Sequence, residues 1–205
     1  AGNLNLGTAA APLSQDLSNP LNLNRFATVD AASGDVPVFL GGGSLNFVTN
    51  GIMQPTLFHD RDAQLVVRTP VSLPAGVALA VTNRTYGIDF EGPVSGAGGL
   101  SFWSGAAGGE MSLKNPANSY SGGTLYANTY GVNAQYTRLY VYTNNALGTG
   151  PVMLSGGNLT PLGAGNQNAG GLTFIGTTSL TNDFVLQGTS PIFCGNGTTN
   201  ESVSA

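Results

Sequence analysis

The stretch Gly92-Pro-Val-Ser-Gly-Ala-Gly-Gly-Leu-Ser-Phe102 shows the pattern that decides the fold. Two similar stretches follow it, Met111-Ser-Leu-Lys-Asn-Pro-Ala-Asn-Ser-Tyr-Ser-Gly-Gly-Thr-Leu125 and Asn145-Ala-Leu-Gly-Thr-Gly-Pro-Val-Met-Leu-Ser-Gly-Gly-Asn-Leu159. Short apolar runs alternate with Gly-Gly, Asn-Pro or Thr-Gly-Pro, which supply the positive φ and the fixed φ that tight corners need. A chain that turns this often is predicted to form short strands and to wind in a coil.

The block from Gly92 to Leu159, about a third of the chain, resembles the autotransporter-associated β-strand repeat of bacterial surface proteins. The most specific pieces are Gly96-Ala-Gly-Gly-Leu-Ser101, Asn115-Pro-Ala-Asn-Ser-Tyr-Ser-Gly-Gly-Thr-Leu125 and Asn145-Ala-Leu-Gly-Thr-Gly-Pro-Val152. The chain departs from the pattern in a Tyr-rich expansion between Ser119 and Asn145, and shows it only faintly from Arg25 to Phe90. That family forms parallel β-helices in secreted passenger regions, so the resemblance implies this fold and this location.

Internal repeats favour the same architecture. A double Gly precedes an apolar-polar-apolar run in Gly42-Gly-Ser-Leu-Asn-Phe47, Gly98-Gly-Leu-Ser-Phe102 and Gly170-Gly-Leu-Thr-Phe174. Recurrence at intervals of tens of residues is typical of a solenoid, and the period of two points alternate side chains inward and outward. We therefore predict an all-β fold, a right-handed parallel β-helix (β-solenoid) with little or no α-helix. Residues 1–205 are predicted to form a single unit, with residues 195–205 as a disordered or linking tail.

Two further expectations concern the burial of particular strands and the contacts of Asn residues at the corners. Longer apolar runs, Leu65-Val-Val67 and Val77-Ala-Leu-Ala-Val81, are expected in strands that are buried on both faces or packed under a loop. Asn side chains at the corners are expected to bond to equivalent Asn residues one coil away, as in cross-β ladders.

Composition excludes several classes of protein. Only 8% of the residues are charged and 41% are hydrophobic, and the six basic residues are scattered in a chain of net charge −4. This gives no cationic stripe for nucleic acid, and no apolar run approaches the ~20 residues of a transmembrane segment. Cys194 is the only cysteine, so neither an intramolecular disulfide nor a cysteine metal cage is expected. The chain opens on Ala1 without a leader, which favours a processed or excised chain.

Two polar clusters are candidates for a chemical site. His59-Asp60-Arg61-Asp62 contains the only histidine and is interpreted as a solvated charged loop rather than a metal or proton-transfer site. Asp89 and Glu91 flank Phe90, which would place both carboxylates on one strand face about 6–7 Å apart. Glycosidic hydrolysis needs carboxyls that face each other across the bond, so the pair is interpreted as a solvated or salt-bridged edge. No catalytic residue, metal site or cofactor is predicted.

Aromatic residues concentrate in one region, at Tyr126, Tyr130, Tyr136, Tyr140 and Tyr142, together with Arg138. In the run from Tyr136 to Tyr142 the even positions share one strand face. Exposed Tyr rings can hold sugars or proteins, so Tyr136, Arg138, Tyr140 and Tyr142 are the speculative ligand-binding residues. The alternative is that these rings pack against the fold. Trp103 is expected in the core or at a cap.

The sequence thus predicts a non-catalytic structural or adhesive segment of a secreted or surface-displayed, outer-membrane-associated bacterial protein, such as a stalk, scaffold or filament subunit. The alternative is a carbohydrate-binding or carbohydrate-cleaving β-helix. The phrase at Gly2–Gly7 recurs at Gly157–Gly163, so unpaired coils are expected at both ends. Expected partners are therefore a second copy in head-to-tail self-association, the continuation of a longer chain, or a surface glycan or protein.

Overall fold

Three parallel sheets make up the fold. The computed structural model describes residues 20–29, 37–60, 63–83, 86–104, 110–128, 138–156, 171–175, 179–187 and 192–194, and these residues contain eighteen strands and no helix. The four-stranded sheet, here sheet I, has the order β1-β4-β7-β10. The two seven-stranded sheets have the orders β2-β5-β8-β11-β13-β15-β17 (sheet II) and β3-β6-β9-β12-β14-β16-β18 (sheet III).

The strands are short, and their bounds are as follows. Sheet I contains β1 (Leu21–Leu23), β4 (Leu45–Phe47), β7 (Val71–Ser72) and β10 (Val94–Ser95). Sheet II contains β2 (Arg25–Val29), β5 (Thr56–Asp60), β8 (Ala78–Asn83), β11 (Gly99–Ser104), β13 (Thr124–Asn128), β15 (Val152–Gly156) and β17 (Phe184–Gln187). Sheet III contains β3 (Val38–Leu40), β6 (Leu65–Val67), β9 (Ile88–Phe90), β12 (Met111–Leu113), β14 (Arg138–Val141), β16 (Gly171–Phe174) and β18 (Ile192–Cys194).

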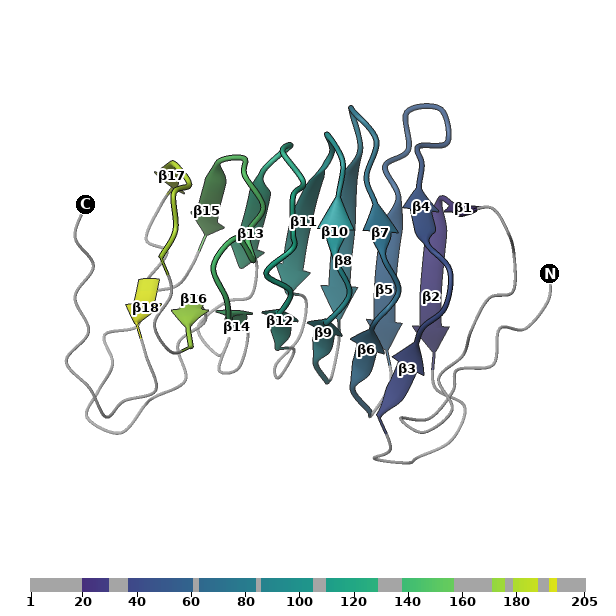
Figure 1. Cartoon of the computed structure of the whole chain (residues 1–205), viewed down its shortest axis with the longest axis horizontal. Helices are drawn as coiled ribbons and strands as arrows, with labels where there is room; N and C mark the ends of the chain where they lie inside the picture. Colours follow the sequence, from purple (N-terminus) through teal and green to yellow (C-terminus); the bar gives the residue numbers. More distant parts are fainter. Residues whose placement is uncertain are drawn as a thin grey trace.

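The chain visits the sheets in a fixed order, so the strands stack as a solenoid. The first four coils give one strand to each sheet, and the later coils add strands only to sheets II and III. Figure 1 shows the coils stacked along the long axis, with β1–β3 at one end and β17–β18 at the other. Ile88 pairs in register with Leu65 and with Met111, 23 residues away in each direction. This arrangement confirms the predicted all-β parallel solenoid.

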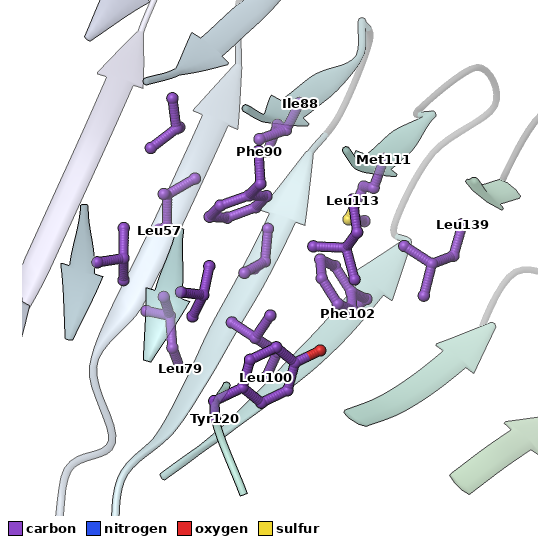
Figure 2. Packing of buried hydrophobic residues seen from close by; sticks show 14 of the residues in the cluster. Leu57, Leu79, Ile88, Phe90, Leu100, Phe102, Met111, Leu113, Tyr120 and Leu139 are labelled. Carbon is purple, nitrogen blue, oxygen red and sulfur yellow. The ribbon is translucent and has the colours of Figure 1, made fainter. Parts of the chain in front are cut away.

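The core is a set of apolar columns that run through the stack. In sheet II, Leu57, Val81, Phe102, Tyr126 and Leu154 are successive register partners, and all are buried. Inward residues of sheet III pack against this column from the other side. The ring of Phe90, for example, contacts the ring of Phe102 edge-on, with 6.3 Å between the ring centroids (Figure 2). Full burial of such a side chain contributes about 1.5–3 kcal/mol. Each coil therefore stabilises its neighbours.

The corners approach so closely that two glycines are required there. A Cβ on Gly122 would lie 2.5 Å from the carbonyl carbon of Gly98 in the coil below. Gly96 has a φ of 110°, and a Cβ there would lie 2.2 Å from the carbonyl oxygen of Leu73. The Gly-rich phrases of the sequence thus mark backbone-to-backbone contact between coils.

Of the two long apolar runs, one is buried on both faces and the other on only one face. All three residues of β6 are buried, as predicted for Leu65–Val67. In β8, however, Ala78 is exposed and Ala80 is half-buried, so burial on both faces is wrong for that run. Its inward residues Leu79 and Val81 are covered by the core, whereas its outward residues face solvent on sheet II.

Asn side chains join neighbouring coils. Asn46 donates from Nδ2 to Oδ1 of its register partner Asn22 at 2.7 Å. This is the expected Asn–Asn bond between coils, but it lies in the middle of β4 and β1 and not at a corner. Asn118 instead accepts from the backbone N–H of Val94 at 2.8 Å and donates to the carbonyl of Ala146 at 2.7 Å. Buried Asn118 therefore satisfies backbone groups of the coils on both sides.

Candidate functional site

His59 occupies the interior, which corrects the prediction of a solvated loop. It lies in β5, two residues after inward-facing Leu57, and its side chain is 0% exposed. The ring Nε2 is 2.5 Å from the carbonyl oxygen of Ala63, and Nδ1 is 2.5 Å from Oγ1 of Thr28. A carbonyl only accepts, so Nε2 carries a proton, while Nδ1 shares a hydrogen bond with the Thr28 hydroxyl. Arg61 and Asp62 lie outside the described residues.

The residues in register with His59 form a polar column that stabilises a corner of the coil. Its register partners in sheet II are Thr28 and Asn83. Asn83 donates from Nδ2 to the carbonyls of Tyr86 at 2.7 Å and Glu110 at 3.1 Å. Both nitrogens of the imidazole are engaged within the protein, so this column is a structural hydrogen-bond network.

Tyr120, from the stretch that resembles the repeat family, is also structural. It is fully buried, and its hydroxyl lies 2.6 Å from Oγ1 of Thr124. Burial raises the pKa of the phenol well above its usual value, because the phenolate would lose its hydration, and the hydrogen bond from Thr124 offsets only part of this effect. Tyr120 is therefore a neutral core residue.

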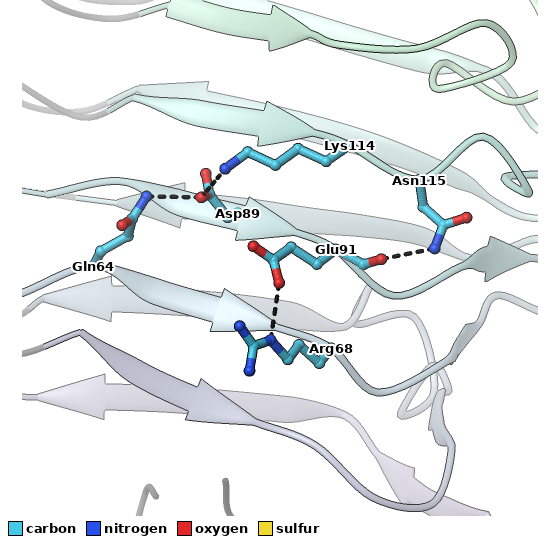
Figure 3. A network of polar contacts seen from close by, with 6 residues as sticks. All are labelled: Gln64, Arg68, Asp89, Glu91, Lys114 and Asn115. Carbon is cyan, nitrogen blue, oxygen red and sulfur yellow. Dashed lines mark hydrogen bonds and ion pairs between the residues drawn. The ribbon is translucent and has the colours of Figure 1, made fainter. Parts of the chain in front are cut away.

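Asp89 and Glu91 point from the outer side of sheet III, and each contacts residues of neighbouring coils. Figure 3 shows Asp89 between Gln64, which donates to Oδ2 at 2.8 Å, and Lys114, whose ammonium forms an ion pair with the same oxygen. Glu91 accepts from Nε of Arg68 at 2.8 Å. Of the two interpretations, the solvated or the salt-bridged edge, the salt-bridged one is confirmed.

The two ion pairs differ in exposure. The side chain of Asp89 is only 5% exposed, whereas that of Glu91 is 35% exposed. Arg68 also lies over the ring of Phe39, 4.3 Å from the centroid. Asp89 is therefore the more desolvated of the two carboxylates, and its Oδ2 is satisfied by both Gln64 and Lys114.

The tyrosines divide between the core and the outer face. Tyr126 is buried inside sheet II, while Tyr140 and Tyr142 share the outer face of sheet III with ring centroids 6.3 Å apart. The hydroxyl of Tyr140 donates to Oε1 of Glu110 at 2.8 Å, and Nζ of Lys114 lies 5.2 Å from the centroid of the Tyr142 ring. Tyr130 and Tyr136 lie outside the described residues, as does the side chain of Arg138, which begins β14.

These two groups of candidates meet in one hollow, here the sheet III groove. It encloses about 250 Å³ and is lined by Gln64, Tyr86, Gly87, Asp89, Glu110, Ser112, Lys114 and Tyr142. Register explains the meeting, because Asp89, Ser112 and Tyr140 are successive partners on the outer face. The carboxylate and the aromatic platform, separated in the sequence, are thus parts of the same site.

Sequence reasoning missed Gln64, Glu110 and Lys114. The available signal was the coil length, since Gln64 and Lys114 each lie 25 residues from Asp89, on opposite sides. Glu110 and Asp89 outnumber Lys114, so the groove carries one excess negative charge at neutral pH. Trp103, expected in the core or at a cap, is instead 39% exposed on the outer face of sheet II, and its Nε1 donates to Oγ of Ser101 at 2.6 Å.

Within the described part of the chain, no three His, Cys, Asp or Glu side chains gather in a way that could hold a metal ion. A search of the same residues finds no helix with the length and apolarity to cross a membrane. The side chains that line the sheet III groove provide carboxylates, an ammonium, amide and hydroxyl groups, and phenol rings.

The fold and the groove define a parallel β-solenoid with a polar and aromatic hollow on one outer face. No protein-family model matches the chain, and comparisons with curated proteins and with solved structures return no match.

Proposed function

We propose that the chain is a non-catalytic structural or adhesive segment of a secreted or surface-displayed bacterial protein, a stalk, scaffold or filament subunit. The observation that carries this proposal is the register of the stack, in which inward residues of successive coils align without interruption from Phe26 to Leu154 in sheet II. The resemblance of residues 92–159 to the autotransporter-associated repeat supports the bacterial surface as the location.

A solenoid suits such a role because it extends by repetition. Adjacent strands lie about 4.8 Å apart, so the seven strands of sheet II or III hold their outer faces along roughly 29 Å. Each added coil lengthens this face and covers the apolar end of the coil before it. A protein of this architecture can therefore hold an outer sheet face at a distance from the point where it is anchored.

Surface display tests the proposal. The chain would be fused to an outer-membrane anchor in a bacterium that does not adhere, and adhesion to polysaccharide-coated and protein-coated surfaces compared with cells that carry the anchor alone. We expect increased adhesion or cell clumping. Purified protein would also be incubated with the same polysaccharides and assayed for new reducing ends. Reducing ends that are released by the protein and lost in Asp89→Asn would contradict the non-catalytic assignment.

The second candidate function, carbohydrate binding, is favoured by the sheet III groove. Cleavage is less well supported, because Asp89 and Glu91 point from the same strand region and each is ion-paired with a different cation. Hydrolysis of a glycosidic bond instead needs an acid and a base or nucleophile on opposite sides of the bond.

A further inference from the structure

We propose that the sheet III groove binds one ring of a neutral glycan. This inference deepens the proposed adhesive role, and it rests on that role for its biological meaning. It is argued from three properties of the groove: its exposed aromatic rings, its mixture of donors and acceptors, and its charge.

The aromatic part is a pair of exposed phenol rings. Tyr142 is 39% exposed and Tyr86 is 47% exposed, and both line the groove. Tyr142 is held in place by the ring of Tyr140, which is itself fixed through its hydroxyl to Glu110 at 2.8 Å. A pyranose presents a face of C–H groups that packs on such a ring, while the phenol hydroxyl can bond to the sugar. A preorganised ring loses little conformational freedom on binding.

The polar part offers both donors and acceptors within one hollow. Gln64 supplies an amide, Ser112 a hydroxyl and Lys114 an ammonium, and Asp89 and Glu110 supply carboxylate oxygens. They come from successive coils and are ordered by contacts with one another, as the bonds of Gln64 and Lys114 to Asp89 show (Figure 3). Polyhydroxyl ligands both donate and accept at every hydroxyl, which matches this mixture.

Charge and size narrow the ligand further. The excess negative charge of Asp89 and Glu110 over Lys114 disfavours uronic acids, sulfated sugars and phosphates. Both carboxylates already have partners, Lys114 for Asp89 and the Tyr140 hydroxyl for Glu110, so neither is left to pair with a cationic amine. The volume of about 250 Å³ is below the ~300–1,000 Å³ of sites for drug-sized ligands. One neutral ring therefore fits, with an affinity on the order of millimolar that display in many copies would raise.

Saturation-transfer NMR on the complete chain tests this site. The probes are the methyl glycosides of glucose, galactose and mannose, with methyl glucuronide and methyl glucosaminide as charged comparisons. We expect transfer to the ring protons of at least one neutral glycoside and at least tenfold less to the charged ones. Tyr142→Ala should reduce the transfer at least tenfold, whereas Tyr142→Phe, which keeps the ring, should retain most of it.

Trp103 provides the matched control, because it has the same 39% exposure as Tyr142 but lies on sheet II. Trp103→Ala should leave transfer unchanged, and Ser112→Leu, which fills the groove from its floor, should abolish it. Circular dichroism confirms that each variant folds. The proposal is overturned if no neutral glycoside receives transfer, if the charged glycosides are preferred, or if Trp103→Ala and Tyr142→Ala weaken transfer equally.

This experiment separates the two proposals. Adhesion of displaying cells without transfer to any glycoside would overturn the glycan site and leave the structural role intact. Transfer that depends on Tyr142, in a protein that confers no adhesion, would support the glycan site and contradict the adhesive role.

Discussion

An inner coil next to the end of the stack and the last described coil place the same kind of residue in different surroundings. Val152 and Leu154 of β15 are 0% exposed, while their register partners Phe184 and Leu186 of β17 are 38% and 57% exposed. All four residues occupy inward-facing positions. The difference teaches that the inward positions of β17 are exposed where no described strand follows in sheet II. At the other end of the stack, Phe26 of β2 and Leu40 of β3 are buried although each lies in an edge strand.

This contrast has an energetic consequence. Repeat proteins gain most of their stability from interfaces between neighbouring units, so a coil with one covered side has about half of the contacts of a middle coil. The middle coils should therefore unfold last, and local opening should begin where β17 is exposed.

The largest effect is expected for Phe102→Ala in the middle of the stack. Phe102 is fully buried and contacts Phe90 edge-on, so truncation should lower the free energy of unfolding by about 3–5 kcal/mol. Leu186→Ala in the exposed coil should cost about 1 kcal/mol or less, because over half of that side chain already meets water. Urea denaturation followed by circular dichroism measures both values. Equal losses would show that the last coil is as well covered as the middle ones.

A second contrast concerns glycine at corners. Gly96→Ala would force a Cβ against the carbonyl oxygen of Leu73 at a φ of 110°, whereas Gly76, with a φ of 78°, has nothing within 4 Å of its Cβ position. We expect a loss of about 2–3 kcal/mol for Gly96→Ala and about 1 kcal/mol for Gly76→Ala. Thermal unfolding of the two variants provides the measurement. If Gly76→Ala were the more harmful, backbone strain and not coil-to-coil approach would decide which glycines are needed.

The third prediction concerns the buried histidine. Thr28→Val removes the hydroxyl that is hydrogen-bonded to Nδ1 of His59 and leaves that nitrogen without this partner, at an expected cost of about 1–2 kcal/mol. Thr82→Val, at a half-buried outward position of the same sheet, should change stability by less than about 0.5 kcal/mol. Denaturant titration compares the pair. If Thr28→Val left the free energy of unfolding unchanged, the polar column of Thr28, His59 and Asn83 would add nothing to the stability of the apolar stack.

The sequence was sufficient to predict the architecture because the period of two and the corner residues act locally. Register was harder to predict, because coil length varies from 20 residues between Leu172 and Ile192 to 33 between Leu139 and Leu172. The three double-Gly phrases, which read as one repeat, precede β4, β11 and β16 and so belong to three different sheets. A double Gly fits any tight corner, so phrase similarity alone does not give register.

The candidate site shows the same limit. His59 was placed in solvent because of its charged neighbours, although its spacing of two from Leu57 indicated the interior. The shared face of Tyr140 and Tyr142 followed from alternation along one strand and is confirmed by their ring contact. Their meeting with Asp89 depends on pairing between coils, through Ser112. Contacts within a strand were therefore predictable, and contacts between coils were not.

The smallest effect is expected on the outer face of the middle coils. Glu91→Gln removes the partly exposed ion pair with Arg68, which retains its position over the ring of Phe39. We expect a loss of about 0–1 kcal/mol in low salt that falls further in 1 M salt, because exposed pairs are weak and screened. Urea denaturation at the two salt concentrations measures this. A loss as large as that of Phe102→Ala would mean that ionic contacts between outer side chains, rather than the covered interior, hold successive coils together, and the contrast between the middle and the last coil would then need an electrostatic cause.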